Sequence, residues 1–205
     1  MDPTLSSDKK KIKVSIVGHS FVRRIRDDII RNTHPVLKPD FGITGAQVQF
    51  ICKGGWRVKD VHSAIPEIIK QKPHIVILQC GSNDLSSETA YVVAVNLIDA
   101  AKKIRTLTEA KVMVCQILQR HQGRYISTVE GVNKFNEKVN VVNEFLKVNC
   151  GPISLKYWKH RGMSNPNVAN FGDILCPDGV HLSHRGQYKY YKSLRGAVLF
   201  GSKEL

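Results

Sequence analysis

The sequence is poor in acidic residues and in long apolar runs. It has 17 Asp and Glu against 31 Lys and Arg among 205 residues, a formal net charge of +14 with neutral histidines. No stretch approaches the roughly 18 apolar residues that span a membrane, and no apolar signal region follows the charged N-terminus. We therefore expect a soluble, cytoplasmic protein that is attracted to an anionic partner.

Cysteine is also scarce and irregularly spaced. The five cysteines are odd in number, and no two of them have the C-x-x-C spacing of a zinc or redox motif. Cys176, His181 and His184 lie close in sequence, but no second cysteine at ligand spacing completes a zinc site. We expect a reducing compartment, no disulfide framework, no metal and no cofactor.

The composition is that of a globular domain. A hydrophobic fraction of 42% with 23% charged residues can build a core and excludes a disordered or collagen-like chain. The length suits one domain. We expect a basic N-terminal linker over residues 1–11 and a single domain over residues 12–205.

Apolar runs alternate with amphipathic segments along the whole chain. The expected strands are Val14–Val17, Ala46–Cys52, Ile75–Cys80, Val112–Leu118 and Ile153–Tyr157. The expected helices are Phe21–Arg31, Val58–Gln71, Glu88–Leu107, Val129–Asn149 and Gln187–Leu199. Alternation of this kind predicts an α/β fold with an open parallel sheet between two helical layers. Ligands of such folds bind beyond the carboxyl ends of the strands.

Residues that suit acyl transfer follow these predicted strands. Ser20 stands between the first strand and the first helix, where the helix N-terminus favours developing negative charge. Asp178 and His181 are three residues apart near the last helix and can supply an orienting carboxylate and a general base. We interpret Ser20, Asp178 and His181 as a catalytic triad.

An oxyanion hole needs hydrogen-bond donors beside the nucleophile. Gly55, after the second strand, offers a backbone N–H without a side-chain obstruction, and Asn83, after the third strand, offers an amide. The backbone N–H of Ser20 is the third expected donor. Gly54 remains an alternative to Gly55, and we read Asp84 as structural.

The order of these residues carries a family resemblance. The blocks GHSF, a glycine after the second strand, GSND and DGVH resemble the four sequence blocks of the SGNH (GDSL-type) hydrolases. The name-giving residues of that family match Ser20, Gly55, Asn83 and His181. The resemblance spans nearly the whole chain and implies a flavodoxin-like sheet of order 2-1-3-4-5 and a serine esterase that works through an acyl-enzyme.

A narrower resemblance concerns longer phrases. VGHSFVRRI, RGM and CPDGVHLSHRGQYKYYKSLRGAVL resemble the esterase domains of first-open-reading-frame proteins of LINE-type non-LTR retrotransposons and genes derived from them. This resemblance implies that the chain is part of a larger RNA-associated protein. His19 and Phe21 depart from the usual Asp and Leu of the SGNH pattern, at positions that do not normally carry the chemistry.

The substrate and the partner of the basic surface stay open. We expect Trp56, Arg23 and Arg24 to contact an ester substrate, which is an acetyl ester, a longer lipid acyl ester or a thioester. The alternative function is a binding module for RNA or an anionic membrane on the same fold, with vestigial catalysis. No RNP aromatic stretch, GXXG clamp or zinc knuckle accompanies the charges.

Overall fold

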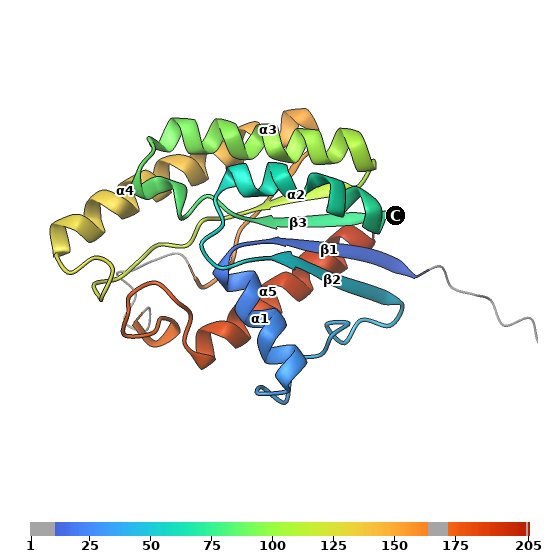
Figure 1. Ribbon diagram of the computed structural model, residues 1–205, viewed down its shortest axis with the longest axis horizontal. Coiled ribbons are helices and arrows are strands. Elements are labelled where there is room, and N and C mark those ends of the chain that lie inside the picture. The colour runs from blue at the N-terminus through green and yellow to red at the C-terminus, as the bar shows by residue number, and fades with distance from the viewer. Residues whose placement is uncertain (1–10, 164–171, 204) are drawn as a thin grey trace, which may run out of the picture.

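The computed structural model describes residues 11–163, 172–203 and 205 (Figure 1). Its centre is a five-stranded parallel sheet in the order β2-β1-β3-β4-β5. The strands are β1 (Ile12–Gly18), β2 (Ala46–Cys52), β3 (Ile75–Gln79), β4 (Lys111–Cys115) and β5 (Lys156–Trp158). The predicted fold class and strand order are confirmed. All but the last residue of the linker expected over 1–11 lies outside the described residues.

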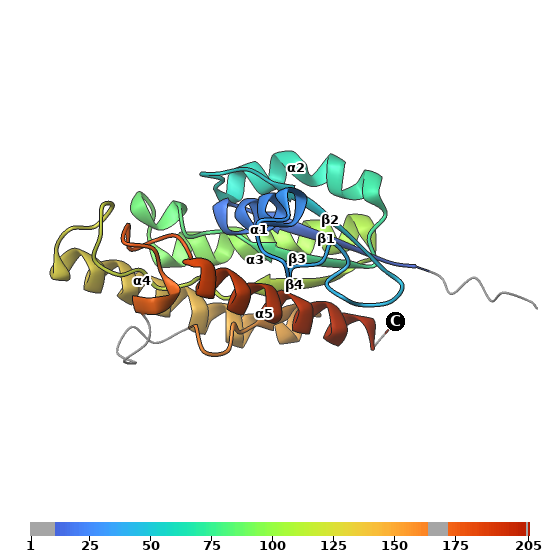
Figure 2. The ribbon, with the colours of Figure 1, turned by 90° about the horizontal axis from the view of Figure 1, so that it is seen from below.

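Five helices cover the two faces of the sheet (Figures 1 and 2). One face carries α1 (Ser20–Arg31) and α5 (His184–Ser202). The other carries α2 (Val58–Gln71), α3 (Ala90–Thr108) and α4 (Val129–Asn149). None of the helices in the described part of the chain is long and apolar enough to span a membrane.

The central strand β3 explains why its sequence is an unbroken apolar run. Val76 and Leu78 belong to the core beneath α2, α3 and α4. Ile75 and Ile77 belong to the core beneath α1 and α5. Because both faces are covered, neither set of alternating positions is left for polar side chains.

Polar side chains at the helix N-termini set boundaries that periodicity did not predict. The helix predicted from Gln187 begins at His184, because the Ser183 side chain accepts a hydrogen bond from Gly186 N at 3.1 Å. The helix predicted from Glu88 begins at Ala90, because Thr89 caps it in the same way.

The last strand also lies later than predicted. Gly151–Ile153 forms a short 3-10 turn with Pro152 in its first turn, and Ser154 follows with a φ of 57°. The strand predicted over Ile153–Tyr157 is therefore β5 at Lys156–Trp158.

Strand β4 ends three residues earlier than predicted. Beyond it, side chains of α4 make hydrogen bonds to the backbone in place of a neighbouring strand. Asn143 Oδ1 accepts from Ile117 N and Asn143 Nδ2 donates to Ile117 O, both at 2.9 Å. Two turns earlier on α4, Asn136 makes the same pair of 2.9 Å bonds with the backbone of Arg120. Gln116 still donates its N–H to Trp158 O of β5 at 2.9 Å, and beyond it the segment after β4 is fixed to α4.

The carboxyl ends of the parallel strands meet at one edge of the sheet, on the left in Figure 1. The segment that leads into α5 lies at the same end of the molecule. Every predicted catalytic residue follows a strand at this edge or belongs to that segment.

Candidate active site

Asp178 and His181 form a tight pair within one turn. Asp178 Oδ2 lies 2.7 Å from His181 Nδ1, and Asp178 Oδ1 accepts from the backbone N–H groups of Val180 and His181 at 2.9 and 2.8 Å. Burial opposes ionisation of Asp178, but the hydrogen bonds from His181 and Val180 outweigh it, so its pKa lies below the usual value. A carboxylate held this way fixes His181 with its proton on Nδ1 and leaves Nε2 as the base.

The loop after β4 supports this turn by direct backbone contact. His121 N donates to Gly179 O at 2.9 Å. A Cβ on Gly123 would lie 2.3 Å from the carbonyl carbon of Asp178, and one on Gly179 would lie 2.1 Å from His121 O. Gly179 also has a φ of +74°, which favours glycine. Both glycines are needed for the two segments to touch.

Ser20 is the first residue of α1, directly after β1 and His19. The position leaves its backbone N–H without a helical partner, and within the described residues that N–H makes no hydrogen bond. The structure brings Asp178 and His181 together, but the described residues contain no hydrogen bond between Ser20 and His181.

His19 is a buried neutral histidine beside Ser20. Its side chain is 2% exposed, and its Nδ1 accepts from Phe21 N at 3.4 Å. Burial, followed by the positive charges of Arg120 and His181, lowers the pKa of His19 to about 3. His19 therefore stays uncharged at neutral pH.

The loop after β2 presents the candidate oxyanion glycine. Gly55 has a φ of +78°, is exposed, and its N–H makes no hydrogen bond within the described residues. Gly54 has no such backbone constraint, and Arg23 Nε lies 3.4 Å from the place of its Cβ. Gly55 is thus the residue whose conformation specifically calls for glycine.

Asn83 is tied to this same loop. Its Nδ2 donates to Trp56 O at 2.9 Å, which uses one of its two amide hydrogens. The neighbouring Asp84 is 8% exposed and accepts from Val58 N, at the start of α2, at 3.1 and 3.3 Å. Asp84 therefore has the structural role that the sequence predicts, and it positions Asn83 beside the glycine loop.

Arg120 is a site residue that the sequence reading missed. Its Nη2 donates to both the backbone O and the Oγ of Ser82 at 3.2 Å, and its guanidinium carbon lies 4.0 Å above the ring centre of Phe135. Burial lowers the pKa of Arg120 to about 10, and its Nε is buried without a hydrogen-bond partner among the described residues. The only sequence signal was its place at the start of a loop after a strand.

Tyr125 is a second missed residue, from the same loop. Its ring meets that of His181 edge-on, with 6.1 Å between centroids, and it is 58% exposed. An exposed ring beside His181 can contact a bound substrate.

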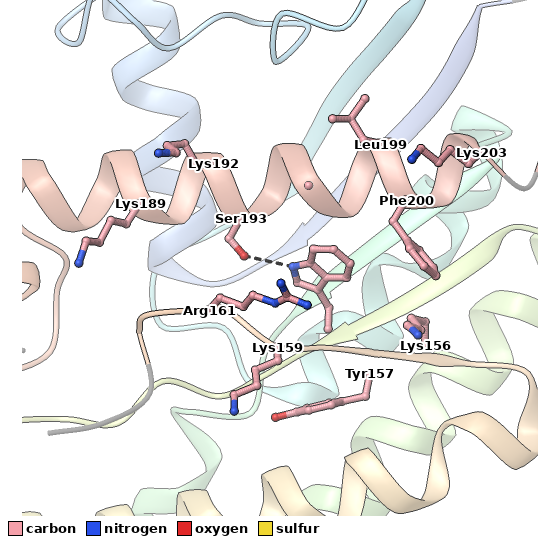
Figure 3. Close-up of a pocket in the computed structure, with 12 residues that line it drawn as sticks. Lys156, Tyr157, Lys159, Arg161, Lys189, Lys192, Ser193, Leu199, Phe200 and Lys203 are labelled. Atoms are coloured by element: carbon pink, nitrogen blue, oxygen red, sulfur yellow. Dashed lines mark hydrogen bonds between the residues drawn. The ribbon is translucent and has the colours of Figure 1, made fainter. Parts of the chain in front are cut away.

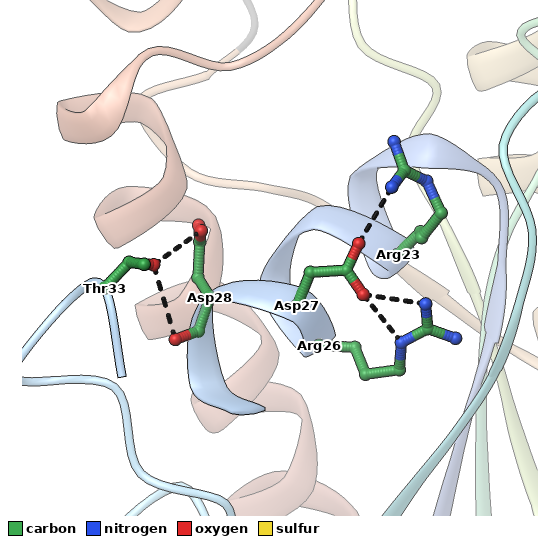
Figure 4. Close-up of polar contacts among 5 residues, drawn as sticks. All are labelled: Arg23, Arg26, Asp27, Asp28 and Thr33. Atoms are coloured by element: carbon green, nitrogen blue, oxygen red, sulfur yellow. Dashed lines mark hydrogen bonds and ion pairs between the residues drawn. The ribbon is translucent and has the colours of Figure 1, made fainter. Parts of the chain in front are cut away.

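The three residues predicted to contact the substrate lie in different environments. Arg23 and Arg26 both bind Asp27, at 2.8 and 2.7 Å, so part of the charge of α1 is neutralised (Figure 4). Arg24 has a buried Nε without a partner among the described residues. Trp56 is half-buried and packs against the core beneath α2 and α3, while its carbonyl holds Asn83.

A polar contact also holds the end of α1. At the end of α1, Thr33 Oγ1 donates to the Asp28 carboxylate at 2.9 Å, which secures the end of the helix (Figure 4).

No cluster of three or more His, Cys, Asp or Glu side chains within residues 11–163 and 172–203 could hold a metal ion.

Comparison with known proteins gives structural rather than sequence matches. No protein-family model and no curated sequence matches the chain. A protein of Bacteroides fragilis assigned to the acylhydrolases superposes with a TM-score of 0.71 at 18% identity, covering 93% of this chain and 88% of that one.

Two more solved structures share the architecture. A GDSL-like lipase of Bacteroides thetaiotaomicron has a TM-score of 0.66 at 15% identity, with coverage of 94% and 89%. A catalytic mutant of Axe2, an acetylxylan esterase of Geobacillus stearothermophilus, has 0.59 at 14% identity, with coverage of 90% and 93%. The chain therefore has the fold of the SGNH (GDSL-type) hydrolases.

Proposed function

We propose that the protein is a serine esterase that hydrolyses carboxylic esters through an acyl-enzyme. The observation that carries the proposal is the Asp178–His181 pair, 2.7 Å apart, at the sheet edge where Ser20 begins α1. The lipases, acylhydrolases and esterases that share the fold support ester hydrolysis as the reaction class.

The mechanism follows from the donors and acceptors at this edge. Ser20 Oγ attacks the ester carbonyl while His181 Nε2 takes its proton, and Asp178 stabilises the imidazolium. The N–H groups of Ser20 and Gly55 and the second amide hydrogen of Asn83 bind the oxyanion. His181 then protonates the leaving alcohol, and a water activated by the same imidazole releases the acid.

A matched pair of serine variants tests the proposal. Ser20→Ala should lower kcat on an aryl acetate by about four orders of magnitude, while Ser63→Ala, on the exposed surface of α2, should retain the wild-type rate. A fluorophosphonate probe provides a substrate-independent readout, because it should modify the peptide that contains Ser20 and no other. Equal turnover by the Ser20→Ala and wild-type proteins excludes the mechanism.

The acyl group is the less defined part of the substrate. We propose acetyl or lipid acyl esters, with Tyr125, Arg23, Arg24 and Trp56 near the site entrance. The acetylxylan esterase and the GDSL-like lipase that share the fold support the two ends of this range. A series of aryl esters from acetate to decanoate, assayed on the wild type, distinguishes them through kcat/KM.

We also propose a cellular setting. The five cysteines are free thiols, which supports a reducing compartment such as the cytoplasm. The resemblance to retrotransposon-encoded esterases supports a larger RNA-associated protein as the context, and sequencing the transcript that encodes this chain tests it. The net charge of +14 supports attraction to an anionic partner, either RNA or an acidic membrane.

A further inference from the structure

A basic groove lies between β5 and α5, apart from the candidate active site (Figure 3). Its volume is about 880 Å³, and none of the predicted catalytic residues lines it. Six of its twelve lining residues are cations, and none is acidic. The cations are Lys156, Lys159, Arg161, Lys189, Lys192 and Lys203.

The two groups of cations form the two walls of this groove. Lys156, Lys159 and Arg161 come from β5 and the residues after it, and the three other lysines come from α5 and the residue that follows it. From Lys189 to Lys203 the helix extends about 21 Å at 1.5 Å per residue. The groove thus offers positive charge along a distance that accommodates several successive phosphates.

The charge of the groove is uncompensated, in contrast to that of α1. Arg23 and Arg26 share Asp27 as an ion-pair partner (Figure 4). None of the six groove cations pairs with an acidic side chain of the described residues. The positive charge of these six side chains is therefore available to an external anion.

Aromatic side chains lie between the two walls. Trp158 and Phe200 pack with 5.9 Å between ring centroids, and Lys156 Nζ lies 4.7 Å from the centroid of the Phe200 ring. Trp158 Nε1 donates to Ser193 Oγ at 3.1 Å, the dashed line in Figure 3. A Cβ on Gly196 would lie 3.3 Å from the indole, so the ring rests against the helix at this glycine.

We propose that this groove binds single-stranded nucleic acid, with phosphates on the lysines and Arg161 and a base against the aromatic floor. The combination of a cationic channel with an aromatic stacking surface is how proteins hold single strands without sequence preference. The inference rests on the proposed attraction to an anionic partner and is independent of ester hydrolysis.

Single strands fit this groove better than a membrane does. A membrane surface engages apolar side chains that protrude from a protein. Here Trp158, Leu199 and Phe200 are half-buried and lie between cationic walls. Base faces that can reach such a floor are available in a single strand and are stacked away in a duplex.

Fluorescence anisotropy with a labelled 12-nucleotide oligouridine measures the binding. The triple variant Lys159→Gln, Arg161→Gln, Lys192→Gln should weaken binding at least about thirtyfold at low salt. Because each phosphate contact on a single strand contributes about 0.7 to the slope of log K against log[salt], the slope should fall by about 2.

A control with the same charge change isolates the groove. Lys70→Gln, Lys102→Gln, Lys103→Gln removes three exposed lysines of α2 and α3 that make no ion pair within the described residues, and it should weaken binding less than about threefold. Phe200→Leu leaves the charge unchanged and should weaken binding about three- to tenfold through lost stacking.

Three results overturn the proposal. The first is an equal loss of oligouridine affinity in the two triple variants, and the second is no binding of oligouridine at low salt. The third is that the groove variant loses affinity for phosphatidylserine vesicles but not for oligouridine. Thermal unfolding verifies that the variants fold. The groove variants should hydrolyse the aryl acetate at the wild-type rate, and Ser20→Ala should bind oligouridine like the wild type. Failure of the groove proposal is thereby separated from failure of the esterase proposal.

Discussion

At the scale of single residues, the candidate site combines local pairs with one long-range cation. Asp178 and His181 meet because a turn of three residues brings them together. Arg120 instead reaches Ser82, 38 residues away, and its charge acts on His19, the residue before Ser20. We interpret Arg120 as a positioning residue that fixes the backbone before Asn83 and adds positive potential near the oxyanion site.

Replacing Arg120 should reveal this role through two readouts. Arg120→Met should lower kcat on the aryl acetate about ten- to a hundredfold with little change in KM, and Arg120→Lys should recover part of the loss. The pKa of His19 should rise from about 3 in the Met variant but stay below 6.5, because burial is the larger cause of its depression. A histidine NMR titration measures this shift.

An unchanged pKa of His19 in Arg120→Met contradicts the inference that the positive charge of Arg120 acts on His19. Arg124→Met is a suitable control, because Arg124 is an exposed arginine of the same loop. It should leave both kcat and the His19 titration unaltered.

The sequence predicts the residues of this site where the motif is local. D-x-x-H and GSND place their own members by a turn and a strand end, so Asp178, His181 and Asn83 are predicted as site residues without tertiary information. Arg120 and Tyr125 could not be identified in that way, because their importance comes from contacts with residues distant in sequence.

At the scale of elements, side chains and glycines of the connecting segments complete the architecture that periodicity outlines. The apolar runs predict the five strands and the five α-helices. Each strand buries side chains on the faces of the sheet, and each helix buries an apolar stripe against one of those faces. Their ends depend on capping by Ser183 and Thr89 and on the amide of Asn143, which pairs with the backbone beyond β4. Such contacts leave no periodic signal in the sequence.

The backbone contact between the loop after β4 and the catalytic turn yields a prediction at this scale. Gly123→Ala should displace Asp178, because the new Cβ would lie 2.3 Å from its carbonyl carbon. We expect kcat to fall at least about tenfold, with a cost of about 1–3 kcal/mol in the free energy of unfolding. The downfield NMR signal of the His181 Nδ1 proton should shift or broaden as the Asp178 bond is disturbed.

Gly151→Ala is the matched control for this substitution. The site of its Cβ has no atom within 4 Å, so both activity and stability should remain at the wild-type level. Wild-type kcat and an unchanged proton signal in Gly123→Ala contradict the role of the loop as a support for the turn.

At the scale of the whole molecule, the cations behind the net charge of +14 differ in whether an acidic side chain pairs with them. The sequence counts cations but does not reveal which are paired. In the structure Arg23 and Arg26 share one carboxylate, that of Asp27, whereas the six cations of the groove between β5 and α5 pair with no acidic side chain of the described residues. The groove is therefore a second concentration of positive charge, apart from the α1 arginines that we expected to contact the substrate.

A buried polar network links the sheet to α5 beneath that groove. His160 is 0% exposed, with Nδ1 2.8 Å from Ser193 Oγ and Nε2 2.8 Å from Gln79 Oε1. Gln79 Nε2 donates to Gln116 O, so Gln79 Oε1 faces His160, and His160 Nε2 carries the proton toward it. Burial lowers the pKa of His160 to about 3, so the ring is neutral and its Nδ1 accepts from the Ser193 hydroxyl.

His19 and His160, the buried histidines whose pKa falls to about 3, predict acid lability of the fold. In the unfolded chain each titrates near 6.5, whereas in the native state each titrates at about 3. Their contribution to stability is therefore full above pH 6.5 and is lost progressively as the pH falls toward 3, because the unfolded state takes up the protons first. Asp84, whose pKa is raised by burial, acts in the opposite direction at the acidic end.

Urea unfolding at pH 7.5, 6.0 and 5.0 measures this dependence while most carboxylates are still ionised. The free energy of unfolding should decrease by about 1.4 kcal/mol per pH unit for each histidine below pH 6. His160→Gln should be less stable at pH 7.5 and should lose about half of the decrease, whereas His62→Gln, on the partly exposed surface of α2, should retain all of it. An equal pH dependence in His160→Gln and the wild type would show that the neutral state of His160 does not control the acid response.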